Sequence, residues 1–441
     1  MSTVVRIVAD HVYVNDDAGT VLSAGVVEID GGLITSVEPV SGSRPRGEGV
    51  LDLGESILMP GLVNAHAHTP MSLMRGVSEG HSLLTLEGWL GAIRSLEAHL
   101  TPELVPASVA VSCAEMIASG TTTFADQYFY AEQYLPVIRD SGLRAAVAYG
   151  IVELGDDDAR AAGLAAAEAF LESAGDDPLV RGWVGPHAFF VDNQLEAIDA
   201  ELAMARRHGA GLHTHYGTSA EEEEACQRDY GRSALSIMRE IGLFDVPLLL
   251  AHCNAIARDE LALLAGTRAT IVPAASVAMI SGAEAPPVRE ALDAGVNVAL
   301  GTDNWCGDNN ADLFEEMRTL GKLAAFTAKT PNSIPPRELI ALATWRGHRA
   351  LGGSDDDGRL VAGAVADVIA LPVGALHRGP AGAQSLASAL AYGASGFSST
   401  DVMTAGRWLK RDGALTTVDL PSARGQQQRD FDELMARVRA A

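Results

Sequence analysis

The sequence of 441 residues predicts an α/β fold, a (β/α)8 TIM-like barrel with a small β-sandwich domain built from both termini. Three observations support it. In the middle of the chain, short apolar segments alternate with helical segments rich in Ala, Leu and Glu, which is typical of βα units. There are eight such apolar segments, the number that closes a barrel. Polar residues follow most of them, and barrel enzymes carry their active sites at the C-terminal strand ends.

The predicted barrel strands are Leu62–His68, Thr122–Asp126, Leu143–Tyr149, Val180–His187, Gly211–His215, Pro247–His252, Thr270–Pro273 and Val296–Asp303. Amphipathic helices are predicted at Leu104–Ala118, Gln194–Arg207, Ser233–Ile241, Pro287–Ala294 and Ala311–Thr327.

The two ends of the chain have a different pattern, of short β-rich pieces separated by turn residues. The N-terminal pieces are Thr3–Ala9, His11–Val14, Gly25–Ile29 and Leu33–Val37, and the C-terminal ones are Asp367–Leu371, Asp401–Ala405 and Trp408–Leu409. Neither set can close a core alone. We therefore expect residues 1–57 and 363–441 to form one sandwich domain with a terminal helix, and residues 58–362 to form the barrel.

The composition limits the classes of partner. With 32 Lys and Arg against 57 Asp and Glu, the net charge of −25 repels nucleic acid and anionic membranes, so we expect a small-molecule substrate instead. The four Cys lack CxxC spacing, which argues against a disulfide framework or a zinc knuckle. With no signal peptide and no run of about 18 apolar residues, the expected location is the cytoplasm.

The first predicted strand ends in a His-x-His pair. Because strand side chains alternate with a period of two, His66 and His68 project from the same face and can share one metal ion. Taken alone the pair is a weak signal, since two such His are equally explained as solvated or core residues. Liganding residues at other strand ends strengthen it, and these are Asp126, His187, His213, His215, His252 and Asp303.

Each of these residues has a structural alternative. Asp303 is either a carboxylate that binds metal and accepts a proton, or a helix N-cap. His252 follows three Leu and an Ala, so it either orients water in the site or is a core His. His213 and His215 share a face, so one binds metal while the other packs a layer deeper. His187 follows a Pro at the barrel mouth and either contacts substrate or stabilises the loop.

Several motifs together resemble the amidohydrolase superfamily, specifically its aminohydrolase and triazine chlorohydrolase group, which includes S-adenosylhomocysteine, guanine and 8-oxoguanine deaminases. They are Pro60-Gly61-Leu62-Val63-Asn64-Ala65-His66-Ala67-His68, Gly185-Pro186-His187, His213-Thr214-His215, Leu250-Ala251-His252 and Gly301-Thr302-Asp303-Asn304, with Trp89 after the first strand. The resemblance runs nearly end to end. It implies the same fold, a barrel with a β-sandwich from both termini.

The resemblance also implies roles for individual residues. The metal ligands would be His66, His68, His215 and Asp303 around one divalent ion, Zn²⁺ or alternatively Fe²⁺. His252 would act on the water and the substrate, and His187 and Trp89 would contact the substrate. Relatives are often dimers, so a homodimer is a possible assembly.

The chain departs from the group at the catalytic acid. A Glu usually stands three residues after the third metal His and protonates a ring nitrogen, but here that place is Thr218. Relatives also tend to carry a His and a Ser-Asn pair after the seventh strand, whereas this chain has Ile271-Val272-Pro273-Ala274-Ala275-Ser276-Val277, which predicts a more apolar substrate wall. Three explanations remain open: a leaving group that needs no proton, a relocated acid at Glu221 or Glu222, or a substrate that carries its own acid. We favour the first and third, because the Glu221–Glu224 run resembles a solvated helix start with a low pKa.

These inferences predict a metal-dependent hydrolase in which activated water displaces an amino or other leaving group from a nitrogen heterocycle, with His252, Asp303 and Thr218 at the catalytic positions. One alternative is ring opening of a cyclic amide or amidine by the same water. Another, of a different class, is a non-catalytic metal-containing binder of small molecules, whose only support is Thr218.

Overall fold

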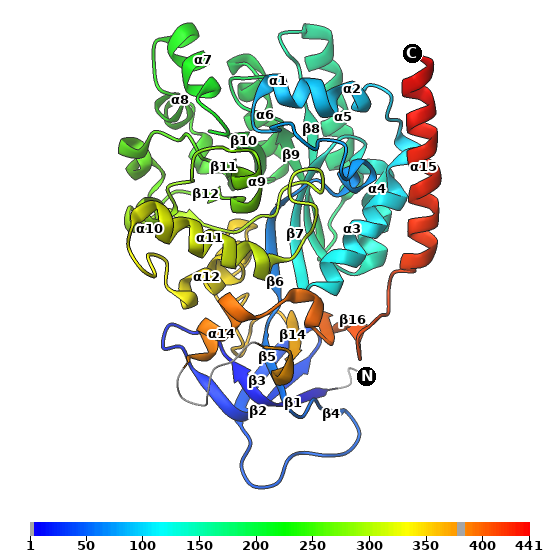
Figure 1. The fold of residues 1–441 in the computed structure, drawn as a ribbon, viewed down its shortest axis with the longest axis vertical. Helices are drawn as coiled ribbons and strands as arrows, with labels where there is room; N and C mark the ends of the chain where they lie inside the picture. The colour runs from blue at the N-terminus through cyan, green and yellow to red at the C-terminus, as the bar shows by residue number, and fades with distance from the viewer. Residues whose placement is uncertain (1–3, 377–383) are drawn as a thin grey trace.

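The computed structural model describes residues 4–376 and 384–441, and a parallel eight-stranded sheet forms its centre (Figure 1). The strands are β6 (Leu62–Ala67), β7 (Thr121–Tyr128), β8 (Arg144–Ile151), β9 (Val180–Pro186), β10 (Leu212–Tyr216), β11 (Leu248–His252), β12 (Ala269–Val272) and β13 (Asn297–Val298). They pair in chain order. All eight predicted strands are therefore confirmed. Most of their residues are buried, as in parallel sheets that are covered on both faces.

The segment after β13 closes this sheet into a barrel. The Ala65 N–H donates to the Leu300 carbonyl (2.8 Å), and the Asp303 N–H donates to the His66 carbonyl (2.9 Å). Gly301 makes this close approach possible, because a Cβ at that position would lie 2.7 Å from His66 Cβ. The first and last strands of the barrel therefore bring the His-x-His pair and Asp303 side by side.

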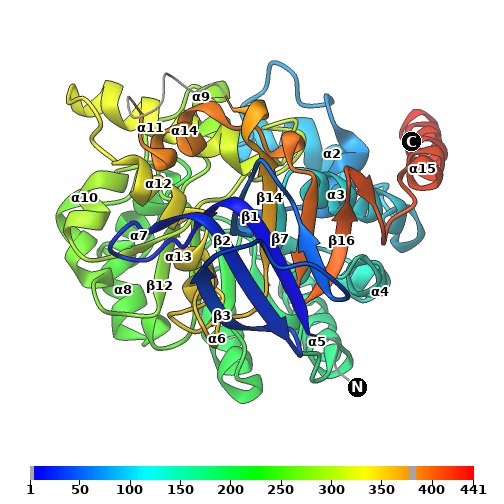
Figure 2. The same ribbon diagram turned by 90° about the horizontal axis from the view of Figure 1, so that it is seen from below.

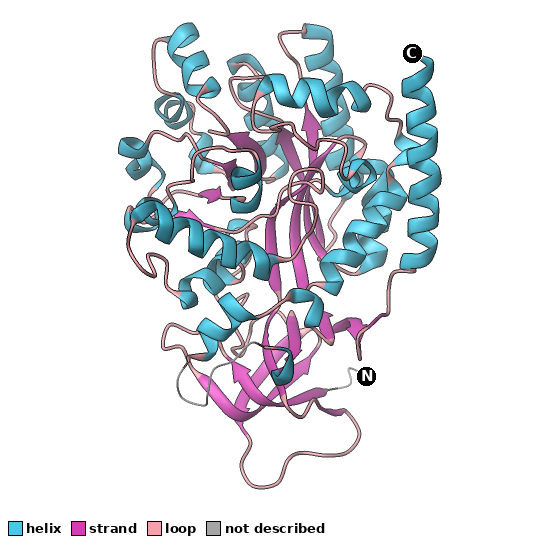
Figure 3. Ribbon diagram, in the orientation of Figure 1, coloured by secondary structure: helices cyan, strands magenta, loops and turns pink. Residues whose placement is uncertain are grey.

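Helices surround the central strands (Figure 3). The longer ones are α3 (Pro106–Ala118), α4 (Ala131–Ser141), α5 (Asp157–Ala174), α6 (Leu195–His208), α7 (Glu221–Tyr230), α11 (Leu313–Ala328) and α15 (Leu420–Ala440). The shorter ones are α1 (Leu86–Trp89), α2 (Ser95–Glu97), α8 (Ala234–Glu240), α9 (Ala275–Ile280), α10 (Val288–Asp293), α12 (Pro336–Leu342), α13 (Trp345–Ala350) and α14 (Leu386–Gly393). The terminal helix α15 packs along α3, where Gln427 Nε2 donates to Ser72 Oγ and Ser108 Oγ (3.0 and 3.3 Å).

Strands from both termini form a second sheet at the end of the barrel where β6 begins (Figures 1 and 2). They are β1 (Val5–Tyr13), β2 (Val21–Asp30), β3 (Leu33–Pro39), β4 (Val50–Asp52), β5 (Ser56–Pro60), β14 (Val368–Pro372), β15 (Asp401–Thr404), β16 (Arg407–Arg411) and β17 (Ala414–Leu415). Strands β5 and β14 pair across the two halves. Residues from both ends also share one apolar cluster, so the two termini build one sheet, as the predicted fold class requires.

The N-terminal sheet differs from the prediction in two details. The pieces Thr3–Ala9 and His11–Val14 are one strand, because β1 pairs with β2 in an unbroken register on both sides of Asp10. Strand β5 was not predicted as a separate strand. Its five residues run into β6 with only Gly61 between them, so no turn signal separates the two.

Asp367 ties the terminal sheet to the barrel. Its carboxylate accepts hydrogen bonds from Arg144 Nε (3.2 Å) on β8, from Thr123 Oγ1 (3.3 Å) on β7 and from the Ala405 N–H (2.7 Å) at the end of β15. The Asp367 side chain is buried, whereas Arg144 is 21% exposed. One carboxylate therefore satisfies donors from three strands.

Replacing Asp367 by Ala is expected to lower the free energy of unfolding by about 2–3 kcal/mol, because three donors lose their acceptor and Arg144 retains partial access to water. Urea unfolding measures the change. The matched control is Asp355→Ala, whose side chain is 88% exposed and which should change stability by less than about 0.5 kcal/mol. Equal midpoints for the two variants would contradict this role.

Within the described ranges, no single helix is long and apolar enough to span a membrane, although the segments Leu86–Glu97 and Pro102–Ala118 meet the length and composition limits as a pair bent by 97°.

Candidate metal centre and active site

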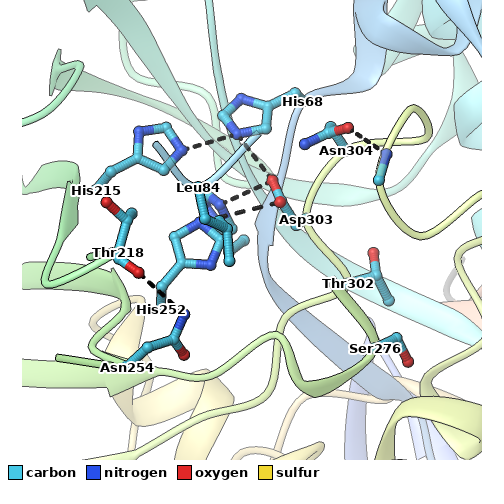
Figure 4. A network of polar contacts seen from close by, with 12 residues as sticks. His68, Leu84, His215, Thr218, His252, Asn254, Ser276, Thr302, Asp303 and Asn304 are labelled. Carbon is cyan, nitrogen blue, oxygen red and sulfur yellow. Dashed lines mark hydrogen bonds and ion pairs between the residues drawn. The ribbon is translucent and has the colours of Figure 1, made fainter. Parts of the chain in front are cut away.

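The predicted liganding residues converge at the C-terminal ends of the barrel strands (Figure 4). His66 and His68 belong to the end of β6, His215 to β10 and His252 to β11, while Asp303 follows β13. His252 and Asp303 have positive φ angles of 74° and 64°. This left-handed conformation costs on the order of 1–3 kcal/mol in a non-glycine residue and is concentrated at functional sites.

The donor atoms of these side chains lie close together. Asp303 Oδ1 lies 3.2 Å from Nε2 of both His66 and His68, and His68 Nε2 lies 3.1 Å from His215 Nε2. Ligand atoms of His66, His215, His252 and Asp303 all lie within 4.8 Å of one another. Three imidazoles and one carboxylate therefore surround a single point, and His68 contacts two members of this group. Imidazole nitrogen and carboxylate oxygen are ligands that zinc binds.

Three of the four His are anchored through Nδ1. His68 donates to the Gln127 carbonyl (2.6 Å) and His215 donates to the His187 carbonyl (2.7 Å), while His66 Nδ1 lies 2.7 Å from His213 Nε2. A proton on Nδ1 leaves the Nε2 lone pair free for a metal, which is the usual arrangement of metal-ligating His. His66 Nε2 and Asp303 Oδ1 are buried, and within the described chain neither makes a hydrogen bond of good geometry. The residues present therefore fit a bound metal ion.

Burial and charge set the protonation of the cluster. Burial lowers the pKa of His66 and lowers that of His215 well below the usual value, and it lowers the pKa of His252 to about 3. Burial alone would raise the pKa of Asp303, but the adjacent imidazoles of His66 and His68 hold it well below its usual range. Burial alone would lower the pKa of His68, but Asp303 and the Gln127 carbonyl raise it above the usual value. Neutral His66, His215 and His252 beside an ionised carboxylate are the forms that coordinate a cation.

Two other polar residues at strand ends have supporting contacts. Asp126 accepts from the Thr69 N–H (2.7 Å) and Thr69 Oγ1 (2.9 Å), so it fixes the chain after His68. His213 is fully buried below the cluster against His66, which matches the expected deeper layer.

Gln127 was missed by sequence reasoning. Its side chain donates to the Pro186 and His213 carbonyls (2.8 and 2.6 Å), and its position directly after Asp126 at a strand end was the available signal.

A cavity opens from the cluster, and apolar side chains form much of its wall, as in small-molecule sites. Its apolar lining includes Met71, Leu83, Leu84, Leu86, Trp89, Phe129 and Val191. The rings of Trp89 and His187 stack at 4.5 Å, and His187 Nδ1 bonds to the Asp192 carboxylate. Both residues predicted to contact substrate therefore lie together in the cavity wall.

The structure also places Thr218 in this wall, one turn before helix α7. Thr218 donates to Glu222 Oε1 from its Oγ1 (2.9 Å) and from its backbone N–H (3.2 Å). Glu222 is only 1% exposed, and burial, partly opposed by its hydrogen bonds, raises its pKa to about 7. The interpretation of the Glu221–Glu224 run as a solvated turn is therefore wrong for Glu222. The four successive Glu residues gave no signal of which one faces inward.

Comparison with known proteins agrees with this geometry. The model of the amidohydrolase family matches residues 57–409. The 5'-deoxyadenosine deaminase of Methanosarcina barkeri is 33% identical over 95% of this chain and 95% of that protein. The 5-methylthioadenosine/S-adenosylhomocysteine deaminase of Moorella thermoacetica is 33% identical over 91% of this chain and 93% of that protein. A solved adenosine deaminase from Xanthomonas campestris with bound zinc is 28% identical, with a TM-score of 0.89 and 98% of each chain covered.

Proposed function

We propose that this chain, which belongs to the amidohydrolase family and is a hydrolase, is a zinc-dependent deaminase of uncharged adenosine-type nucleosides. The observation that carries the proposal is the convergence of four His and Asp303 on one point at the mouth of a barrel, next to a cavity with a largely apolar wall. The deaminase names of relatives that match end to end support the same reaction.

The proposed ligands are His66, His68, His215 and Asp303. The anchored Nδ1 atoms of the three His support this set, because Nε2 of each is then held toward Asp303. The chemistry that a bound zinc ion supplies is activation of water as a nucleophile near neutral pH. His252 differs from the other three His, since its Nδ1 is buried and has no hydrogen-bond partner in the described residues.

The remaining steps are assigned to residues of the chain. The Asp303 carboxylate takes the proton that water loses as it attacks the ring carbon. His252 Nε2 lies 3.9 Å from Asp303 Oδ2, a position from which it orients the attacking water and the oxygen of the tetrahedral centre. Trp89 and His187 position the heterocycle, and the surrounding apolar side chains exclude bulk water.

The charges around the cavity favour a substrate without an anionic group. Among the described lining residues there is no Lys or Arg, whereas five carboxylates are present, from Glu97, Asp192, Glu221, Glu222 and Asp303. Arg94 lies over the Trp89 and Phe129 rings, but its guanidinium is paired with Glu97 at 3.6 Å. A carboxylate or phosphate on the substrate would lose water without gaining a cationic partner.

A panel of five adenine compounds tests the proposal: adenosine, 5'-deoxyadenosine, 5'-methylthioadenosine, S-adenosylhomocysteine and adenosine monophosphate. We expect the highest kcat/KM for the deoxy and methylthio compounds. S-adenosylhomocysteine should be on the order of 10-fold poorer and the monophosphate on the order of 100-fold poorer, because the carboxylate of the first and the phosphate of the second gain no cationic partner. Ammonia release and the ultraviolet change of the purine ring measure turnover. Preference for the monophosphate would contradict the proposed substrate class, and failure to deaminate any of the five would contradict the proposed function.

A further inference from the structure

We propose that Glu222, held in place by Thr218, is the proton donor of this active site and replaces the Glu that related enzymes carry at the Thr218 position. This proposal rests on the proposed function and names a further catalytic residue for it. Glu222 lies on the first turn of α7 (Glu221–Tyr230), and it lines the same cavity as His215, His252 and Asp303.

The contacts of Glu222 leave one oxygen available. Oε1 accepts both hydrogen bonds from Thr218, at 2.9 and 3.2 Å. Oε2 is buried and makes no hydrogen bond within the described part of the chain. A buried carboxyl oxygen without a partner is costly unless it is protonated or meets a ligand group. Glu222 therefore has an anchored oxygen and a free one at the wall of the substrate cavity.

The other carboxylates of the cavity already have partners. Asp303 lies among the proposed metal ligands, and Asp192 accepts from the Ala188 N–H (2.9 Å) and bonds to His187. Glu97 accepts from Tyr128 Oη (2.7 Å) and is paired with Arg94.

Glu221 is also engaged, because its Oε2 accepts from the Leu86 N–H (3.0 Å) at the start of α1, and Glu221 is less buried than Glu222. Of the two acids that the sequence left open, Glu222 is therefore the one whose buried oxygen has no partner within the described part of the chain. Its pKa of about 7, raised by burial, keeps part of the population protonated near neutral pH, which suits a general acid.

Two carboxyl groups, those of Asp303 and Glu222, account for every proton transfer of the reaction. As water adds to the ring carbon that bears the amino group, Asp303 takes one water proton and the Glu222 Oε2–H protonates the adjacent ring nitrogen. When the carbon–nitrogen bond breaks, the amino group takes the proton from Asp303 and leaves as ammonia. The new hydroxyl returns its proton to Glu222 as the carbonyl forms. One water is consumed, one ammonia is released and both carboxyls return to their starting states.

Thr218 acts as a positioning residue in this arrangement. Its two hydrogen bonds lower the Glu222 pKa, in opposition to the larger effect of burial. Removing the hydroxyl in Thr218→Val should therefore raise that pKa. Because the donor must be protonated, activity falls as pH rises through its pKa, so Thr218→Val should move the alkaline limb of the kcat profile to higher pH. A Thr218 that only packs in the wall would leave the limb where it is.

The test uses zinc-loaded full-length protein and the best nucleoside of the panel. Glu222→Gln should lower kcat by at least about 100-fold with zinc content and melting temperature near the wild type, and it should remove the alkaline limb that Glu222 causes. The matched control is Glu224→Gln, an exposed residue of the same helix turn, which should keep full activity. The double variant Thr218→Glu with Glu222→Gln should recover at least about 10-fold of the lost kcat, because it restores a carboxyl at the neighbouring position.

Two results would overturn the assignment. One is a Glu222→Gln protein that is folded, zinc-loaded and within about 3-fold of the wild-type kcat. The other is a large loss in Glu221→Gln while Glu222→Gln stays active, which would assign the acid to the neighbouring Glu. Both results are compatible with the proposed deaminase activity. A wild-type protein that turns over none of the five compounds would instead contradict the proposed function itself.

Discussion

Replacing Asp303 by Ala is expected to lower kcat/KM by at least about 10³-fold and to release the bound metal. The carboxylate lies 3.2 Å from both His66 and His68 Nε2, so the variant removes the negative charge that offsets a divalent cation among neutral imidazoles. It also removes the proposed acceptor of the water proton, a contribution that by itself is typically on the order of 10²–10⁴-fold. Metal analysis after dialysis and nucleoside turnover measure the two effects.

Asp259→Ala is the matched control, because this exposed carboxylate lies after β11 and away from the cluster. It should keep wild-type zinc content and activity. If Asp303→Ala instead retained about one zinc per chain and remained active, Asp303 would be neither a ligand nor the base. Stability gives a further check: the φ of 64° at Asp303 is strained for any residue with a Cβ, so Ala does not relieve that strain.

Much of the fold could be predicted because the barrel strands are covered on both faces. A buried strand such as β11 is a continuous apolar run ending in a polar residue, and this pattern differs clearly from the amphipathic helices between the strands. The terminal sheet was less clear. Strands β1 and β2 continue past polar residues because register with a partner strand, not local composition, determines where they end.

The residues of the candidate site could be predicted where they lie on or directly after a predicted strand. Period-two alternation placed His66 and His68 on one face, and the strand-end rule collected His215, His252 and Asp303. Glu222 lay outside the reach of both rules. Glu222 contacts Thr218, and the adjacent Glu221 accepts a hydrogen bond from Leu86, which lies 135 residues before Glu221 in the chain. Long-range packing of a loop against a helix start leaves no periodic trace in the sequence.

The two His residues of β10 should separate metal binding from support of the metal site. His215→Ala is expected to lose zinc and activity, with kcat/KM reduced by at least about 10³-fold, because it removes a proposed ligand whose Nδ1 is fixed by the His187 carbonyl. His213→Ala removes only the partner of His66 Nδ1, so it should weaken zinc binding by about 10–100-fold and recover activity when zinc is added. It should also lower the free energy of unfolding by about 1–3 kcal/mol, because His66 loses a buried hydrogen bond.

Zinc titration against a competing chelator, followed by turnover at saturating zinc, distinguishes the two variants. Zinc affinity is expected to be highest in the wild type, lower in His213→Ala and lowest in His215→Ala. Excess zinc should restore the activity of His213→Ala but not that of His215→Ala. The reverse order would mean that the side chains of β10 face the barrel mouth two residues out of the described register. That shift would also displace Thr218 from the cavity wall, so the same titration tests the geometry on which the proton-donor assignment depends.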